Sequence, residues 1–237
     1  MRPHHAQDTT AMAQPGFRIL PFGPQADPAL IAQLAAVATA HLSDNMHRMQ
    51  AVAAEIRPFH KGGKLVGPAL TVRVPPGDNL MVHKAIDIAR PGDVIVVDAG
   101  GVTAQAIIGE IMSLHAEKRG VAGMIIDGSI RDAGAIAASS FPVYARGVTH
   151  RGPYKNGPGE INVAVSIGGL VIHPGDIIVG DEDGLLALAP EDAPALLKAA
   201  LAYAKKEENI LADIRAGRVD RAWVDATLEQ KGCKPHP

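Results

Sequence analysis

Two short motifs carry residue types that could do chemistry. They are Gly109-Glu110 and, separated from Glu110 by twenty residues, Arg131-Asp132. An arginine can bind a carboxylate through two parallel hydrogen bonds, and an aspartate supplies the hard oxygen that Mg²⁺ or Mn²⁺ prefers. A 2-oxo acid needs both, a cation for its carboxylate and a metal to polarise its carbonyl. From spacing alone, the simpler interpretation is an aspartate that caps a helix beside a solvated arginine, because Arg-Asp is a common dipeptide.

The elements around these motifs are predicted to place them at the edge of a sheet. Residues 93–98 and 123–127 are short apolar runs typical of buried strands. Residues 103–118 are predicted as a helix that ends at Arg119-Gly120. Glu110 is therefore expected on a helix, and Arg131 and Asp132 just past the end of a strand, where ligands collect in α/β sheets.

The rest of the chain alternates between predicted helices and strands, which indicates one mixed α/β domain in layers. Asp27 and Pro28 predict the start of a first helix, and Ser43-Asp44 offer the cap of a second. Further helices are expected over 79–89 and 190–215, and further strands over 64–74, 142–147, 161–166, 169–173, 176–179 and 185–189, with 161–166 and 169–173 as a hairpin. We expect a loose arm over residues 1–16, the domain over 17–228 and a tail over 229–237.

Other polar groups are better explained by structure than by chemistry. The run from Asp181 to Gly184 lacks the calcium-loop pattern and is predicted as a hairpin turn with Asp183-Gly184 as the turn residues. Glu207-Glu208 is typical of a solvated helix face. His83 lies on a predicted helix and is interpreted as structural, while the glycines show no nucleotide fingerprint and the ten histidines no zinc-enzyme spacing.

Composition excludes several classes of function. A net charge of −2 without basic runs gives no reason to expect a nucleic-acid partner. No apolar run approaches the ~18 residues needed to span a membrane, so we expect no membrane association. The single cysteine, Cys233, allows no internal disulfide, which favours a cytoplasmic protein.

Taken in order, a larger set of motifs resembles a known family. These are Ser43-Asp44, Gly67-Pro68-Ala69, Gly77-Asp78-Asn79, Pro91-Gly92-Asp93-Val94, Gly109-Glu110, the run 127–132, Gly159-Glu160-Ile161-Asn162 and Pro174-Gly175-Asp176. The chain resembles, over roughly residues 30–217, the 4-hydroxy-4-methyl-2-oxoglutarate / 4-carboxy-4-hydroxy-2-oxoadipate aldolases. That family also contains the regulator of ribonuclease activity A, which binds a nuclease and does no chemistry.

The resemblance implies a layered α/β/β/α fold of the swivelling phosphohistidine-domain type. It also implies a homotrimer, or a homohexamer built from two trimers, with active sites between subunits. In such an assembly a further acid, Glu207 or Glu208, would reach a metal through water from a neighbouring subunit's C-terminal helix.

Within one subunit, the resemblance assigns roles to the two motifs. Asp132 would coordinate Mg²⁺ or Mn²⁺ directly, and Arg131 would bind the substrate carboxylate. Glu110 would hold a metal-bound water, although some family members have aspartate there. The backbone from Gly109 through Glu110 and Ile111 to Met112 would contact the rest of the 2-oxo acid.

The reaction implied by the resemblance is a metal-dependent carbon–carbon cleavage that yields pyruvate, through its enolate, and a second 2-oxo acid. Decarboxylation of oxaloacetate would pass through the same enolate. The alternatives are a non-catalytic regulator of ribonuclease activity and a related lyase for another 2-oxo acid. The acids Glu110, Asp132 and a late glutamate favour an enzyme. The stretch 45–47 and the loop 150–156, with Lys155, are the candidates for contacting the distal end of the substrate.

Overall fold

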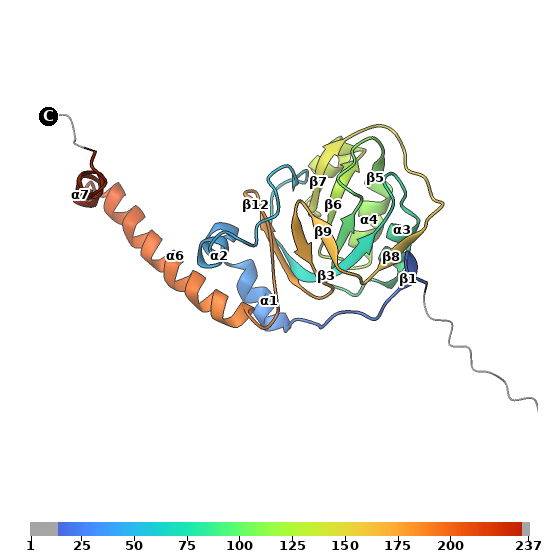
Figure 1. Ribbon diagram of the computed structural model, residues 1–237, viewed down its shortest axis with the longest axis horizontal. Helices are drawn as coiled ribbons and strands as arrows, with labels where there is room; N and C mark the ends of the chain where they lie inside the picture. The colour runs from blue at the N-terminus through green and yellow to red at the C-terminus, as the bar shows by residue number, and fades with distance from the viewer. Residues whose placement is uncertain (1–13, 234–237) are drawn as a thin grey trace, which may run out of the picture.

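A mixed ten-stranded sheet forms the centre of the computed structural model, which describes residues 14–233 (Figure 1). Its main path runs β1-β8-β3-β4-β6-β7-β2, with β5 on β6 and with β11 joining β3 to β12. The strands are β1 (Phe17–Ile19), β2 (Arg57–Pro58), β3 (Leu65–Arg73), β4 (Val94–Asp98), β5 (Ala106–Ile108), β6 (Gly123–Ile130), β7 (Val143–Val148), β8 (Gly159–Ile161), β9 (Val165–Ile167), β10 (Leu170–Ile172), β11 (Ile177–Asp181) and β12 (Gly184–Leu188).

Helices cover both sides of this β structure. They are α1 (Pro28–Ala35), α2 (Thr39–Asn45), α3 (Leu80–Ile88), α4 (Glu110–Lys118), α5 (Ala133–Ala138), α6 (Ala193–Arg215) and α7 (Ala222–Gln230). As the sequence predicts, Asp27 caps α1 by accepting a hydrogen bond from the N–H of Ala29, and Pro28 occupies the first helical position. Within residues 14–233, no helix combines the length and the apolar character needed to cross a membrane.

Successive side chains along a strand point to opposite faces of the sheet, so the core is built in layers. In β4, Ile95 and Val97 pack with α3 and α4, whereas Val94 and Val96 pack on the opposite face with the β9–β10 hairpin. The β11–β12 pair repeats the pattern, because Ile178 faces that second cluster while its neighbours face α1, α2 and α6. The predicted layered α/β domain is confirmed; its assignment to the swivelling phosphohistidine-domain type stays a prediction.

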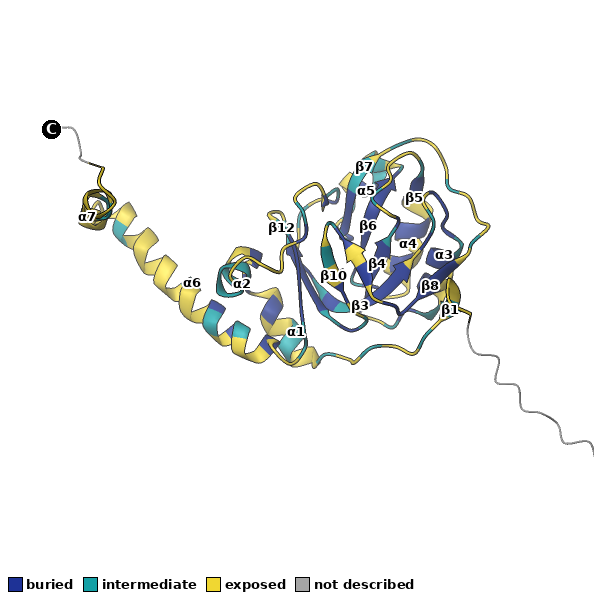
Figure 2. Cartoon of the chain, viewed as in Figure 1, coloured by how far each residue is buried: buried dark blue, intermediate teal, exposed yellow. Residues whose placement is uncertain are grey.

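Helix α6 extends away from the layered domain formed by the sheet and the preceding helices. Its first turns pack against α1 and α2, and its second half extends away from the sheet to α7 (Figures 1 and 2). The buried residues of α6 all lie at its start, namely Ala193, Leu197 and Ala200. The long helix was predicted and Gly217 ends it in a left-handed conformation (φ 67°), but α7 was not predicted.

Several predicted boundaries are wrong, and each has a local cause. The predicted helix 103–118 begins only at Glu110, because the buried run of β5 pairs with β6 and Gly109 separates strand from helix. Ser43 and Asp44 lie inside α2 and cap no second helix. Asp181 pairs with Gly184 across the β11–β12 ladder, so the turn residues are Glu182 and Asp183.

The predicted hairpin of 161–166 and 169–173 is formed by shorter strands. Ile161 belongs to β8, which pairs with β1 and β3, and the hairpin itself joins β9 to β10. Most of the predicted N-terminal arm and the last four residues of the predicted tail lie outside the described residues.

Candidate functional site

Parallel pairing of β5 with β6 brings the two candidate motifs together. Ile108, the last residue of β5, is in register with Ile130, the last residue of β6. Because parallel strands end at the same edge of a sheet, the next residues, Gly109 and Arg131, lie side by side there. The N–H of Arg131 donates to the carbonyl of Ile108 at 3.0 Å, which closes this edge. The twenty residues between the motifs therefore contain the rest of α4 and β6, which bring the chain back to the same edge of the sheet.

Asp132 turns its carboxylate back over the start of α4. Its backbone is left-handed (φ 55°, ψ 37°), which is uncommon outside glycine. The carboxylate accepts a hydrogen bond from the N–H of Glu110 at 3.1 Å and lies 3.6 Å from Nε of Arg131. Both side chains are 42% exposed, so they are available to a ligand. The simpler interpretation was that Asp132 caps a helix. It does so, but the helix is α4, which begins at Glu110 of the other motif.

Gly109 allows this arrangement, because any larger residue would displace one or both of these side chains. A Cβ built on Gly109 would lie inside 3.0 Å of both the Asp132 carboxylate and Cγ of Arg131, at 2.9 Å from the latter. The φ of Gly109 is −150°, so the constraint is space and not backbone conformation. The absent side chain is what lets the carboxylate reach the helix terminus.

The start of α4 adds backbone donors to the site. The first N–H groups of an α-helix have no partner within the helix, and they carry the positive end of its dipole. Ile111 and Met112 follow Glu110 in this first turn and line the same cavity as Arg131 and Asp132. A carboxylate placed here would meet the helix N–H groups and the guanidinium together.

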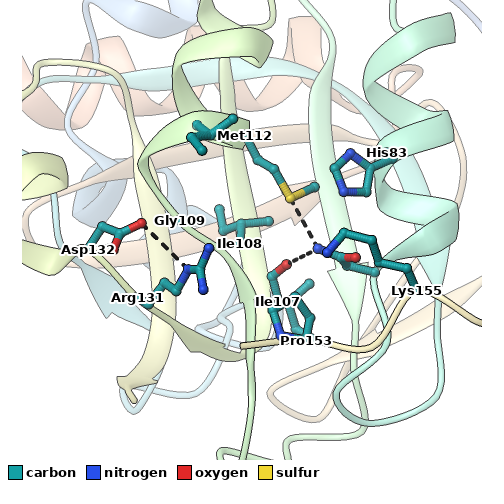
Figure 3. Close-up of a pocket in the computed structure, with 11 residues that line it drawn as sticks. His83, Ile107, Ile108, Gly109, Met112, Arg131, Asp132, Pro153 and Lys155 are labelled. Carbon is teal, nitrogen blue, oxygen red and sulfur yellow. Dashed lines mark hydrogen bonds and ion pairs between the residues drawn. The ribbon is translucent and has the colours of Figure 1, made fainter. Parts of the chain in front are cut away.

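The cavity beside the two motifs has a volume of about 180 Å³. Figure 3 shows Arg131 and Asp132 on one side and His83 and Lys155 on the other, with Ile107 and Ile108 between them. Its full lining is Asn79, His83, Ile107, Ile108, Gly109, Ile111, Met112, Arg131, Asp132, Pro153 and Lys155. The cavity thus has positive charge at two ends and an apolar floor.

His83 faces this cavity, although its position on a helix suggested a structural role. Burial lowers the pKa of His83, and the charge of Lys155 lowers it further. Its Nε2 is buried without a hydrogen-bond partner among the described residues. A neutral imidazole with a free buried nitrogen is suited to a polar group of a ligand.

Asn79 was named only as part of a motif, and its side chain proves to brace the site. Its Nδ2 donates to the carbonyl of Ile107 at 2.8 Å and contacts Sδ of Met112 at 3.2 Å. These contacts tie the start of α3 to the end of β5 and the start of α4. The local signal in the sequence was the position of Asn79 at the start of the helix predicted over 79–89.

The donor set fits a hard divalent cation held largely by water. Among residues 14–233 no group of three or more His, Cys, Asp or Glu side chains is arranged to hold a metal. Asp132 lines this cavity, whereas the side chain of Glu110 lines a neighbouring cavity with Ser113 and Ala135. Mg²⁺ typically uses one or two carboxylates and keeps several waters. The residues present therefore suit Mg²⁺ or Mn²⁺ better than a metal that needs nitrogen or sulfur ligands.

The two late glutamates lie elsewhere in the chain. Glu207 pairs with His41 of α2, whose ring also packs on Tyr203, and Glu208 pairs with Lys205 at 2.7 Å. All these contacts are on α6 or against it, on the far side of the body from α4 (Figure 1). Within one chain, neither glutamate joins Glu110, Arg131 and Asp132.

The fold and the site define an α/β protein with a guanidinium, a carboxylate and a helix N-terminus around one cavity at a sheet edge. A family model described as RraA-like, Aldolase/RraA, matches residues 39–187, and the chain belongs to this family. All the candidate residues of the cavity fall inside the matched range, whereas α6 and α7 follow it.

Three proteins similar to this chain carry different names. A protein of Halalkalibacterium halodurans named "Putative 4-hydroxy-4-methyl-2-oxoglutarate aldolase" is 43% identical over 164 residues, 69% of this chain and 78% of that protein. An "RNA-processing inhibitor RraA" from Thermus thermophilis has a TM-score of 0.60 at 30% identity over 64% of this chain and 92% of its own. An "uncharacterized protein" from Pseudomonas syringae pv. tomato superposes with a TM-score of 0.75 at 26% identity, over 84% and 95% of the two chains.

Proposed function

We propose that this protein is a divalent-metal-dependent aldolase that cleaves 4-hydroxy-4-methyl-2-oxoglutarate or 4-carboxy-4-hydroxy-2-oxoadipate to pyruvate and a second 2-oxo acid. The observation that carries the proposal is the convergence of Arg131, Asp132 and the first turn of α4 on one cavity. Relatives named as aldolases support the reaction class.

Arg131 and the start of α4 bind the 2-oxo acid end of the substrate. The guanidinium donates two hydrogen bonds to the substrate carboxylate, and the N–H groups of Ile111 and Met112 hold its other oxygens. Asp132 would ligate Mg²⁺ or Mn²⁺ directly, and Glu110 would hold a water near the cation. The cation, when bound, supplies a Lewis acid that withdraws electron density from the 2-oxo group.

The bond that breaks joins C3 to C4. A base removes the proton of the C4 hydroxyl, the C4 oxygen becomes a carbonyl, and the electrons of the C3–C4 bond form the enolate of pyruvate. The positive charge of Arg131 lies next to this developing negative charge. Loss of CO₂ from oxaloacetate gives the same enolate, so decarboxylation is proposed as an activity of the same site.

Lys155 contacts the distal carboxylate of the substrate in this proposal. It lines the cavity across from Arg131, at a place suited to the second acid group of a dicarboxylate (Figure 3). The other candidate, the stretch 45–47, does not line this cavity in one chain. It begins at Asn45, the last residue of α2, and in this proposal it would reach a substrate only from a neighbouring subunit.

The working assembly is proposed to be a trimer or a pair of trimers. The second half of α6 and the residues after it leave large apolar side chains exposed, among them Tyr203 (41%), Ile210 (44%), Ile214 (52%) and Trp223 (66%). A helix without tertiary packing is marginal in water, and a second copy would cover this face. In that arrangement Glu207 or Glu208 completes the metal site through water.

The second candidate function is a non-catalytic inhibitor of RNA processing. The similarity to the Thermus protein supports it. An inhibitor that acts through its surface has no use for a cavity with an arginine, an aspartate and a buried free imidazole nitrogen, and these features favour the enzyme.

Pyruvate release tests the proposal, measured by coupling to lactate dehydrogenase. Chelated protein would be offered 4-hydroxy-4-methyl-2-oxoglutarate and oxaloacetate, with and without added Mg²⁺ or Mn²⁺. We expect turnover only with metal. Asp132→Asn keeps an oxygen that can accept from the N–H of Glu110 but removes the charge, so it should fold and lose at least about 100-fold in kcat.

Glu117→Ala is the matched control, since Glu117 is an exposed acid later on α4. It should retain wild-type turnover. Wild-type protein without turnover above the free-metal background would refute the aldolase and favour the inhibitor. Full activity in Asp132→Asn would refute the metal-ligand role while leaving the reaction class intact.

A further inference from the structure

Gly77-Asp78-Asn79 is a motif whose middle residue has no role in the site described so far. Asp78 is 4% exposed and lies two residues before α3, with its carboxylate turned toward the loop that carries Lys155. A buried carboxylate needs hydrogen-bond donors. The hydrogen-bond donors around the Asp78 carboxylate therefore indicate its role.

Both carboxylate oxygens of Asp78 accept from backbone N–H groups. One oxygen accepts from Asn156 at 2.6 Å and from Gly157 at 3.0 Å, and these residues directly follow Lys155. The other accepts from Leu80 at 2.9 Å, in the first turn of α3. The carboxylate thus ties the loop to the helix that also carries His83.

The residue on the other side of Lys155 is held by the same motif. The N–H of Tyr154 donates to the carbonyl of Gly77 at 2.7 Å, and the N–H of Asn79 donates to the carbonyl of Tyr154 at 3.0 Å. Lys155 is therefore fixed in backbone position from both flanks. Its own side chain is exposed and long, so only its starting point is set by the fold.

We propose that Asp78 is a positioning residue that holds Lys155 over the cavity and thereby sets the preference for substrates with a second carboxylate. This inference rests on the proposed function. A lysine side chain loses rotamer freedom when it binds a ligand, and a mobile backbone beneath it would add to that cost. Holding the backbone in place before the substrate arrives leaves more of the ion-pair energy for selectivity.

The chemistry of the carboxylate explains why an aspartate is needed. Three N–H groups point at two oxygens, and a carboxylate is an acceptor on both. An asparagine would accept with one atom and oppose an N–H with its own NH₂ group at the other. Asp78→Asn should therefore loosen the loop partly, and Asp78→Ala fully.

The test compares two substrates that share the 2-oxo acid end. 4-Hydroxy-4-methyl-2-oxoglutarate carries the distal carboxylate, and 4-hydroxy-2-oxopentanoate lacks it; both release pyruvate. For Lys155→Ala we expect KM for the first to rise about 10- to 100-fold, with kcat/KM for the second nearly unchanged. Asp78→Ala should show the same pattern with a smaller rise, and Asp78→Asn a smaller one still.

A double variant separates positioning from general damage. If Asp78 acts through Lys155, Asp78→Ala added to Lys155→Ala causes no further loss of selectivity, because coupled residues are not additive. Asp27→Ala is the matched control: Asp27 caps α1 in the same way, accepting from the N–H two residues on, away from the cavity. It should leave the selectivity unchanged.

The possible outcomes distinguish failure of the positioning role from failure of the aldolase proposal. Equal losses on both substrates, or additive effects in the double variant, would overturn the positioning role and leave the aldolase standing. If wild-type protein cleaves neither substrate, both proposals fail. Should Asp78→Ala not fold, the comparison of Asp78→Asn with wild type decides the matter.

Discussion

Replacing Gly109 with alanine adds one methyl group at the most crowded point of the site. The new Cβ would lie within 3.0 Å of the Asp132 carboxylate and 2.9 Å from Cγ of Arg131, and both belong to side chains that can move. Backbone φ at Gly109 is −150°, which alanine adopts freely. The substitution should therefore displace the two functional groups and leave the fold in place.

The size of the effect follows from these distances. The Asp132 carboxylate must withdraw by about 1 Å to restore normal contact, and it then loses its bond to the N–H of Glu110. Loss of this cap should lower the free energy of unfolding by about 1 kcal/mol. Alanine restricts the unfolded chain more than glycine does, which should raise it again by about 0.4–1 kcal/mol. Stability should stay near wild type. A displacement of about 1 Å in a catalytic group costs on the order of 100-fold in rate, so kcat should fall by about that factor.

Gly134→Ala is the control for this prediction. Gly134 lies on α5, two residues after Asp132, and a Cβ there has no heavy atom within 4 Å. It should gain up to about 1 kcal/mol of stability with turnover unchanged. The assays are metal-dependent pyruvate release and urea unfolding. Wild-type turnover in Gly109→Ala would show that the contact of Asp132 with the start of α4 has no part in catalysis.

Two further predictions use other residues. Arg131→Lys keeps the positive charge but cannot form two parallel hydrogen bonds to a carboxylate, so KM for the 2-oxo acid should rise about 10- to 100-fold. Mn²⁺ binding, measured by electron paramagnetic resonance, should stay unchanged. An unchanged KM would contradict the carboxylate-binding role of Arg131. Burial lowers the pKa of His60 below 6.5, and its Nδ1 accepts from the N–H of Val143 in the neutral form. The unfolded chain therefore takes up the proton first, and the free energy of unfolding falls as pH drops below 6.5 until the folded-state pKa is passed. His60→Asn, which retains an acceptor, should flatten that acid limb in urea titrations, and an identical pH profile would contradict this cause.

Much of the fold could be predicted because it follows local rules. The cap of α1 at Asp27, the buried runs of β3 and β4 and the glycine that ends α6 are each determined by a few neighbouring residues. β5 was missed because three apolar residues before a helix continue the helical pattern, and only pairing with β6 makes them a strand. Strand pairing joins residues far apart in the sequence, so no local pattern reveals it.

The positions of the candidate residues on the fold could be predicted only in part. Arg131 and Asp132 were expected at a strand end, and they lie there. The sequence could not show that Asp132 would cap α4, because that contact depends on the register of Ile108 with Ile130. The position of His83 at the cavity could not be predicted for a similar reason: its surroundings depend on how α3 packs beside Lys155.

The position of α6 bears on how the proposed site could be completed. In one chain Asp132 is the acid that lines the cavity and Glu110 lines a neighbouring one, which is a sparse set for a cation in a catalytic role. The same chain carries Glu207 on a helix that points away from its own body and exposes an apolar face. A protein that keeps such a face in solution exposes it to aggregation unless another surface covers it. Placing that helix against the cavity of a second copy would bury the face and bring in the missing acid, so one arrangement would satisfy the requirements of stability and of chemistry.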